Sequence, residues 1–185
     1  MLENLINLVK QHAGDAVINN PAVPNEQNDA VVSEASNSII SGLQNAVSGG
    51  NVKDVLSLFS GNQPVTSNGL TQNIQGNFIQ NLVGKFGLDQ SQAGGIASSL
   101  IPMVLQNLVH KTNDPNDGSF NIQNIFNSLS GGGSSGLNIE GLMNKFKGGA
   151  FDKDGDGDTD LNDVVAAFSG GKGGGILDTV KGLFS

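Results

Sequence analysis

The 185-residue chain is long enough for one domain of ordinary size with a small appended module, and two full-sized domains are not expected. The absence of Cys excludes disulfides and zinc sites with thiolate ligands. The formal net charge is −8, but Arg is absent and the 9 lysines are scattered, so we do not expect a nucleic-acid-binding surface.

The first dozen residues predict a helix. Apolar residues recur there at helical spacing, at Leu2, Leu5, Ile6, Leu8 and Val9. The segment has an acid at Glu3 and neither a basic leader nor an apolar run of signal-peptide length. No window approaches the roughly 18 to 20 apolar residues of a membrane span. We therefore expect a cytoplasmic protein, although the sequence leaves unusual export open.

A second, longer helix is predicted after a break at Pro21 and Pro24. It starts near Glu26 and ends at Gly49 and Gly50. Its apolar positions keep the same three-and-four rhythm, at Val31, Val32, Ala35, Ile39, Ile40, Leu43 and Val47.

The stretch 78–111 repeats this design. An amphipathic segment begins at Phe78, a turn follows at Gly87, and Asp89 with Gln92 predicts a capping box for the next helix. Pro102 lies inside that helix, where it removes a backbone donor, so we expect a kink or a split.

The two halves of this region align after a shift of 65 residues, as from Val31 to Ile96. The same shift places Ala35 on Leu100, Ile39 on Val104, Ile40 on Leu105 and Leu43 on Leu108. We interpret this as an internal duplication of residues 1–61 and 72–131. A shorter unit also recurs, with Asn as the expected N-cap and Gly at the end, at residues 51–61, 121–131 and 138–148.

No segment of useful length alternates with period two, so the predicted fold class is all-α. We expect a bundle of short amphipathic helices over residues 1–131 and a Gly/Ser linker over 132–137. A calcium-binding module of the EF-hand type follows over 138–170, and a Gly linker with a C-terminal amphipathic helix over 171–185.

The run from Phe86 to Leu108 suggests a family. A helix, the Gly87-Leu88 turn, the helix capped by Asp89 and the step to Pro102 together resemble the YidB-like bacterial proteins. The resemblance covers about residues 72–131, with a weaker echo in 1–61. It implies a helical fold and, because the function of that family is not established, no site residue. We expect the acidic C-terminal module to lie outside the family pattern.

Residues 152–163 carry the strongest chemical signal. Six aspartates lie there, and without them and Lys153 the remaining 11 acids and 8 lysines sum to −3. The aspartates have the spacing of a calcium loop, with Gly157 at the sharp turn in position 6. Asp158 would bind through its backbone carbonyl. The predicted ligands of Ca²⁺ are Asp152, Asp154, Asp156, Asp158, Asp160 and Asp163.

This loop resembles the EF-hand loop and, with Asp163 at position 12, the calcium repeat of dockerins still more. Position 8, which is usually aliphatic, holds Thr159, and no second complete loop is present. We therefore expect a single site of about micromolar to millimolar affinity, which magnesium could also occupy. The alternative is a solvated acidic turn without specific ion binding.

The remaining candidates are weaker. His12 and His110 have no recognisable partner, so we assign them no catalysis. We expect a non-enzymatic calcium-binding protein that acts as a binding or scaffolding module, with a protein partner or a second copy of itself. The alternative is a self-assembling or membrane-surface protein that uses its amphipathic helices, including residues 176–185.

Overall fold

The computed structural model describes residues 2–129 and, in addition, residues 139, 141, 143 and 144. The chain divides into two units, residues 1–137 and 138–185. The predicted linkers, the calcium module and the C-terminal helix lie almost entirely outside the described residues. The four described residues of the second unit are helical.

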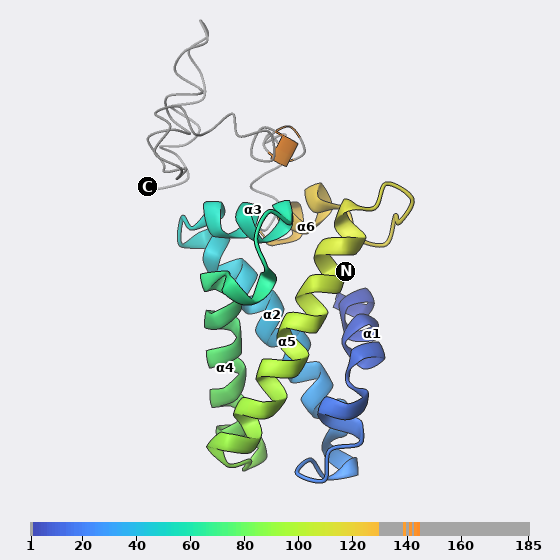
Figure 1. The fold of residues 1–185 in the computed structure, drawn as a ribbon, viewed down its shortest axis with the longest axis vertical. Helices are drawn as coiled ribbons and strands as arrows, with labels where there is room; N and C mark the ends of the chain where they lie inside the picture. The colour runs from blue at the N-terminus through green and yellow to red at the C-terminus, as the bar shows by residue number, and fades with distance from the viewer. Residues whose placement is uncertain (1, 130–138, 140, 142, 145–185) are drawn as a thin grey trace, which may run out of the picture. The chain divides into compact units, whose positions relative to one another are not determined.

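The first unit is a bundle of helices, and its described residues contain no strand, which confirms the all-α prediction (Figure 1). The helices, in chain order, are α1 (Leu2–His12), η1 (Gly14–Ile18), η2 (Asn25–Gln27), α2 (Asn28–Ser48), α3 (Val52–Ser60), η3 (Val65–Ser67), α4 (Gly69–Phe86), α5 (Gln90–Asn113) and α6 (Ile122–Leu129).

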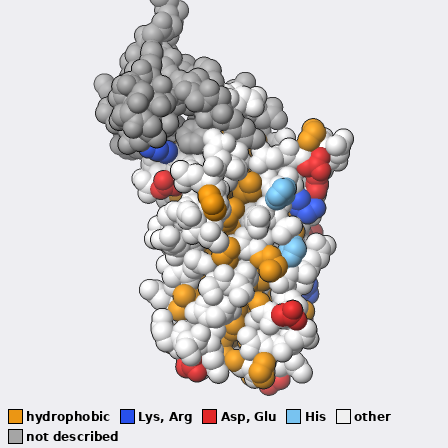
Figure 2. All heavy atoms as spheres, in the orientation of Figure 1, with side chains coloured by type: hydrophobic (Ala, Val, Ile, Leu, Met, Phe, Trp, Pro, Cys, Tyr) orange, Lys and Arg blue, Asp and Glu red, His pale blue; other side chains and the backbone are white. Residues whose placement is uncertain are grey.

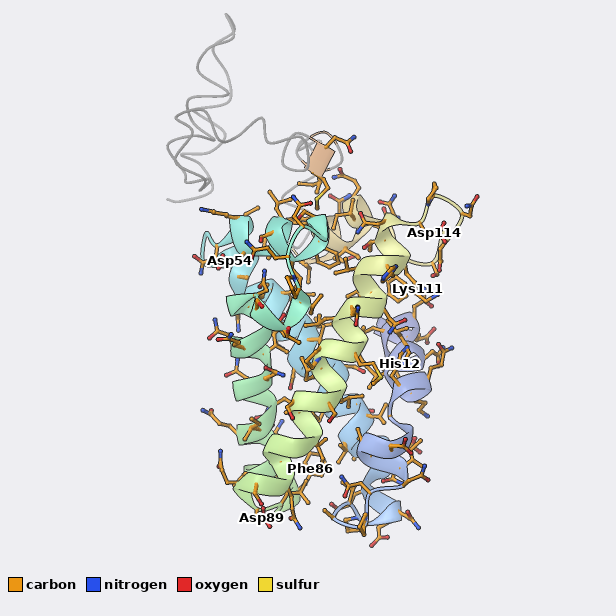
Figure 3. All side chains as sticks on the ribbon, viewed as in Figure 1. His12, Asp54, Phe86, Asp89, Lys111 and Asp114 are labelled. Atoms are coloured by element: carbon orange, nitrogen blue, oxygen red, sulfur yellow. The ribbon has the colours of Figure 1, made fainter. Side chains whose placement is uncertain are left out.

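α2 and α5 begin and end close to their predicted boundaries, whereas α4 begins at Gly69, well before the segment predicted from Phe78. The capping box of α5 is present, because Asp89 Oδ1 accepts from the backbone N–H of Gln92 at 2.8 Å and Gln92 Oε1 accepts from the N–H of Asp89 at 3.2 Å. Gly87 ends α4 with φ of 70°, a left-handed conformation that glycine adopts without strain. Asp89 and Asp114 mark the two ends of α5 (Figure 3).

Pro102 does not split α5, which runs without interruption from Gln90 to Asn113. Proline has no N–H to offer the carbonyl of Ser98, and this loss ordinarily costs about 3 kcal/mol in a helix interior. Tertiary packing offsets the cost, because Leu100, Ile101 and Val104 on either side are fully buried.

The short helices follow the predicted unit only in part. Gly61 ends α3 in the left-handed conformation, with φ of 71°, as expected. Asn121 Oδ1 accepts from the N–H of Asn124 at 3.2 Å and so caps α6. Asn51 precedes α3 but its side chain forms no capping hydrogen bond, so the cap predicted there is wrong.

Burial follows the shift of 65 residues over both halves. The pair Val31 and Ile96 is buried, as are Ala35 and Leu100, Ile39 and Val104, and Leu43 and Leu108, while Ile40 is half-buried and Leu105 buried. The shift also pairs buried residues in the preceding segments, Leu5 with Leu70, Val9 with Ile74, Ala13 with Phe78, Val17 with Leu82 and Val23 with Leu88. This pattern supports the predicted duplication.

The helices of the two halves also pack in equivalent ways. α1 packs against α2 and α5, and α4 packs against α5 and α2. The short helix α3 contacts α5, while α6 contacts α2. Each repeat therefore places its helices against the long helix of the other repeat. The core forms between them, and the fully buried Phe59, Phe78 and Phe126 are among its largest side chains.

α2 and α4 approach each other closely at Gly42. A Cβ atom on Gly42 would overlap Cγ1 of Ile74 and lie 3.0 Å from its Cδ1. Ile74 is itself fully buried, so its side chain has little room to move away. The two helices run antiparallel, because Gly42 meets Ile74 whereas Glu34 pairs with Lys85.

We predict that Gly42→Ala destabilises the protein by about 1–3 kcal/mol, because the added methyl group forces the helices apart in a packed core. The matched control is Gly76→Ala in α4, where an added Cβ meets nothing within 4 Å. That change should raise stability by about 0.5–1 kcal/mol through helix propensity. Urea unfolding measures both, and equal stability of Gly42→Ala and the parent chain would contradict the packing.

Candidate functional site

The predicted calcium ligands, Asp152, Asp154, Asp156, Asp158, Asp160 and Asp163, all lie outside the described residues. The calcium site therefore stays a prediction. Among the residues that the structure describes, no group of three or more His, Asp or Glu side chains lies close enough together to hold a metal ion.

The two histidines lie on the same face of the bundle (Figure 2). His12 is half-buried at the end of α1, and His110 is exposed near the end of α5. Neither forms an ion pair with a described carboxylate. A general base needs a partner or a substrate proton within hydrogen-bond reach, and the described residues supply no such partner.

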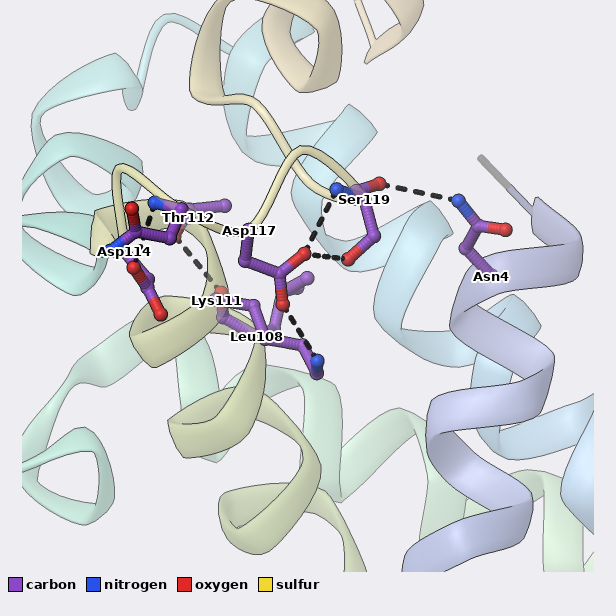
Figure 4. Close-up of polar contacts among 8 residues, drawn as sticks. Asn4, Leu108, Lys111, Thr112, Asp114, Asp117 and Ser119 are labelled. Atoms are coloured by element: carbon purple, nitrogen blue, oxygen red, sulfur yellow. Dashed lines mark hydrogen bonds and ion pairs between the residues drawn. The ribbon is translucent and has the colours of Figure 1, made fainter.

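A polar cluster orders the turn between α5 and α6 (Figure 4). Lys111 Nζ lies 2.8 Å from Asp117 Oδ2, and the N–H of Ser119 donates to Asp117 Oδ1 at 2.9 Å, as does its hydroxyl. Asn4 Nδ2 donates to the carbonyl of Ser119 at 3.2 Å. The hydrogen bond from Asn4 connects this turn to α1.

The cluster lowers the pKa of Asp117 to about 2, from an ordinary value of 3.8. The largest cause is the hydrogen bond from Lys111, followed by those from Ser119. A carboxylate whose pKa is lowered in the folded state stabilises the fold at pH values above its pKa in the unfolded chain. This contribution is lost as the pH falls from about 4 through about 2.

We predict that Asp117→Asn lowers the melting temperature at neutral pH and that the difference from the parent chain shrinks between about pH 4 and about pH 2. NMR titration of the Asp117 carboxyl measures the pKa directly. Lys111→Gln is the matched variant, because it removes the largest cause and should raise that pKa. A midpoint near 3.8 in the parent chain would contradict the cluster.

A polar cleft of about 330 Å³ lies along the seam between α2 and α4. Four residues of each helix line it, Glu34, Asn37, Ser38 and Ser41 from α2 and Asn77, Gln80, Asn81 and Lys85 from α4. These positions recur at helical spacing, so one face of each helix contributes the whole lining. Sequence reasoning missed this cleft, because the spacing is visible in each helix but the pairing of the two faces is not.

Two features set the chemistry of the cleft. Lys85 Nζ lies 2.9 Å from Glu34 Oε2, which joins the helices at one end, and the carboxylate side chain is only 12% exposed. Ser38 is 5% exposed, and its hydroxyl has no hydrogen-bond partner. A buried hydroxyl without a partner is uncommon and is most often satisfied by water or a ligand.

In the described part of the chain, no helix combines the length and the apolar character that a membrane crossing requires. This finding agrees with the absence of a spanning window in the sequence.

A family described as bacterial protein of unknown function (DUF937) matches residues 68–180, more than half of the chain. Neither curated proteins nor solved structures give a match. The match begins at Asn68, whose side chain accepts from the N–H of Leu70 at the start of α4. It extends past residue 131 and includes residues 152–163, so the match to this family covers the acidic module. The chain therefore belongs to the DUF937 family of bacterial proteins of unknown function.

Proposed function

We propose that this protein binds one calcium ion in residues 152–163 and that its helical body serves as a non-enzymatic binding or scaffolding module. The observation that carries the proposal is the spacing of the aspartates in the sequence. The body would present a surface to a protein partner, or to a second copy, once the ion has ordered the loop.

The chemistry of the loop favours calcium. Calcium takes about six to eight oxygen ligands at 2.3–2.6 Å, and a chain that curls round one ion presents alternate side chains to it. Asp152, Asp154 and Asp156 stand at the first, third and fifth positions, and Gly157 permits the sharp turn that follows.

Electrostatics also favours an ion. Six aspartates within twelve residues repel one another unless a cation neutralises them. Ion binding and ordering of the loop would then be coupled, because the attraction of a bound cation would hold the carboxylates close together. The family match includes these positions but assigns no metal to them.

The non-enzymatic part of the proposal rests on the sequence, which offers no recognisable partner for His12 or His110. In the described body, Asp89 caps a helix and Asp117 fixes a turn. The relation to YidB-like proteins stays part of this proposal, since it rests on the run around Pro102 and gives no activity to transfer.

Calorimetric titration of calcium into chelator-stripped protein tests the proposal. We expect one site with a dissociation constant of about micromolar to millimolar and weaker binding of magnesium. Asp152→Ala combined with Asp156→Ala should abolish the heat, because it removes two ligands of the same ion.

The matched control replaces two exposed acids of the described body, Glu3→Ala with Asp54→Ala, and lowers the negative charge equally. It should leave calcium binding unchanged. Equal loss of binding in both double variants would reduce the loop to a general acidic surface, and no heat at about 10 mM calcium would overturn the site.

A second candidate function is self-assembly, which exposed aliphatic side chains favour. Ile18 is 46% exposed and Val83 is 37% exposed, and the shift of 65 residues places one on the other. Both repeats thus keep an apolar side chain at the same exposed position, as a repeated contact between copies would require.

If the chain self-assembles through these positions, its sedimentation coefficient should rise with concentration, and Ile18→Ser with Val83→Ser should suppress the rise. Ala30→Ser and Gly84→Ser, neither of which removes an exposed large aliphatic side chain, form the control pair. A monomer at all concentrations, with or without calcium, would exclude this alternative.

A further inference from the structure

The cleft between α2 and α4 differs from an ordinary helix seam in its lining. Its eight lining residues include four carboxamides, from Asn37, Asn77, Gln80 and Asn81, and two hydroxyls, from Ser38 and Ser41. No aliphatic or aromatic side chain takes part. Pockets for apolar ligands are lined mainly by such side chains, so this cleft suits a hydrophilic ligand.

The charge of the lining excludes ionic ligands. Glu34 and Lys85 are the charged residues of the lining, and they neutralise each other at 2.9 Å. A phosphate or carboxylate ligand would meet one ammonium group that is already paired, and a metal ion would meet one carboxylate. The ligand that fits is therefore uncharged.

The hydrogen-bonding groups favour a ligand that both donates and accepts at many points. A carboxamide offers one acceptor oxygen and two N–H donors, and each serine hydroxyl offers both functions. Neighbouring hydroxyl groups on a sugar ring present the same combination. A peptide backbone would also find partners here, but its side chains would find no apolar pocket.

The second, independent observation is the hydroxyl of Ser38. Ser38 lines the cleft and is 5% exposed, that is, 95% buried. Its Oγ atom has no hydrogen-bond partner. Leaving a buried hydroxyl unpaired costs free energy, which a ligand hydroxyl that reaches it would recover.

The other repeat lacks this arrangement. At the positions equivalent to Asn37 and Ser38 it has Pro102 and Met103, and Met103 is 45% exposed. Packing of α1 against α5 therefore does not need polar residues at these places. The carboxamides and the hydroxyl belong to the α2–α4 seam and not to the equivalent seam between α1 and α5. The fold itself therefore does not require them.

We propose that the α2–α4 cleft binds a neutral saccharide of one or two sugar rings, with Ser38 at its floor. This site is independent of the calcium loop. Affinity is about millimolar, because no aromatic ring stacks on the sugar and hydrogen bonds that replace water contribute modestly.

Two-dimensional NMR of the full chain tests the site with maltose, cellobiose and N,N′-diacetylchitobiose. We expect at least one of these disaccharides to shift the side-chain amide signals of Asn37, Asn77, Gln80 and Asn81 in a saturable manner. Ser38→Ala and Gln80→Ala should each weaken binding roughly two- to tenfold, as the loss of one hydrogen bond predicts.

The matched control is Gln72→Ala, which removes an exposed carboxamide of α4 outside the cleft and should leave affinity unchanged. Ser38→Ala should not lower the melting temperature, because the hydroxyl has no partner in the fold. A purely structural serine would instead lower stability when replaced.

Three outcomes would overturn the proposal. The first is no saturable shift with any disaccharide at about 100 mM. The second is an equal effect of Gln72→Ala and Gln80→Ala on binding. The third is tighter binding of glucose 6-phosphate, or of a blocked tetra-alanine peptide, at the same signals, which would assign the cleft to an anion or to a peptide.

Discussion

The close approach of α2 and α4 at Gly42 governs the arrangement of this bundle. Because Gly42 has no side chain, Ile74 reaches the backbone of α2 and is fully buried there. The register of the two antiparallel helices is then fixed, and Lys85 comes to lie beside Glu34. That ion pair is partly exposed and contributes little by itself. The packing at Gly42 positions it, together with the polar faces that line the cleft.

The two repeats share a core but differ at their surfaces. Buried apolar positions coincide after the shift, because each long helix must cover the same neighbours. Where the first seam has Gly42 opposite Ile74, the equivalent positions of the second hold Asn107 and Val9, a larger residue with a smaller one. The equivalent positions Ser38 and Met103 differ both in polarity and in burial, since Ser38 is buried and Met103 is 45% exposed.

Polar side chains in the described body are used mainly to end helices and fix turns. Asp89 caps α5 at one end, and Asp117 organises the turn that follows its other end. Both carboxylates have a lowered pKa for the same reason, namely hydrogen bonds that favour the charged form, donated chiefly by the Gln92 backbone to Asp89 and by Lys111 to Asp117. For the six aspartates of 152–163, whose negative charges exceed the single positive charge of Lys153, an ion is proposed instead.

Local pattern in the sequence determined which segments are helical and where most of them end. The spacing of Val31, Ile39 and Leu43 selects one buried face, and the cap at Asp89 acts within a few residues of itself. The calcium-type spacing of residues 152–163 is likewise a local pattern, so the calcium proposal rests on the sequence alone.

Tertiary structure decided the rest, because contacts between distant segments outweigh local preference. Pro102 favours a break, yet the buried residues around it keep α5 continuous. Asn51 is a good cap by type, but the backbone before α3 does not direct its side chain to the helix. The cleft depends on the pairing of one face of α2 with one face of α4, and no local pattern states which helix meets which. That pairing is settled by the fit of Ile74 against Gly42.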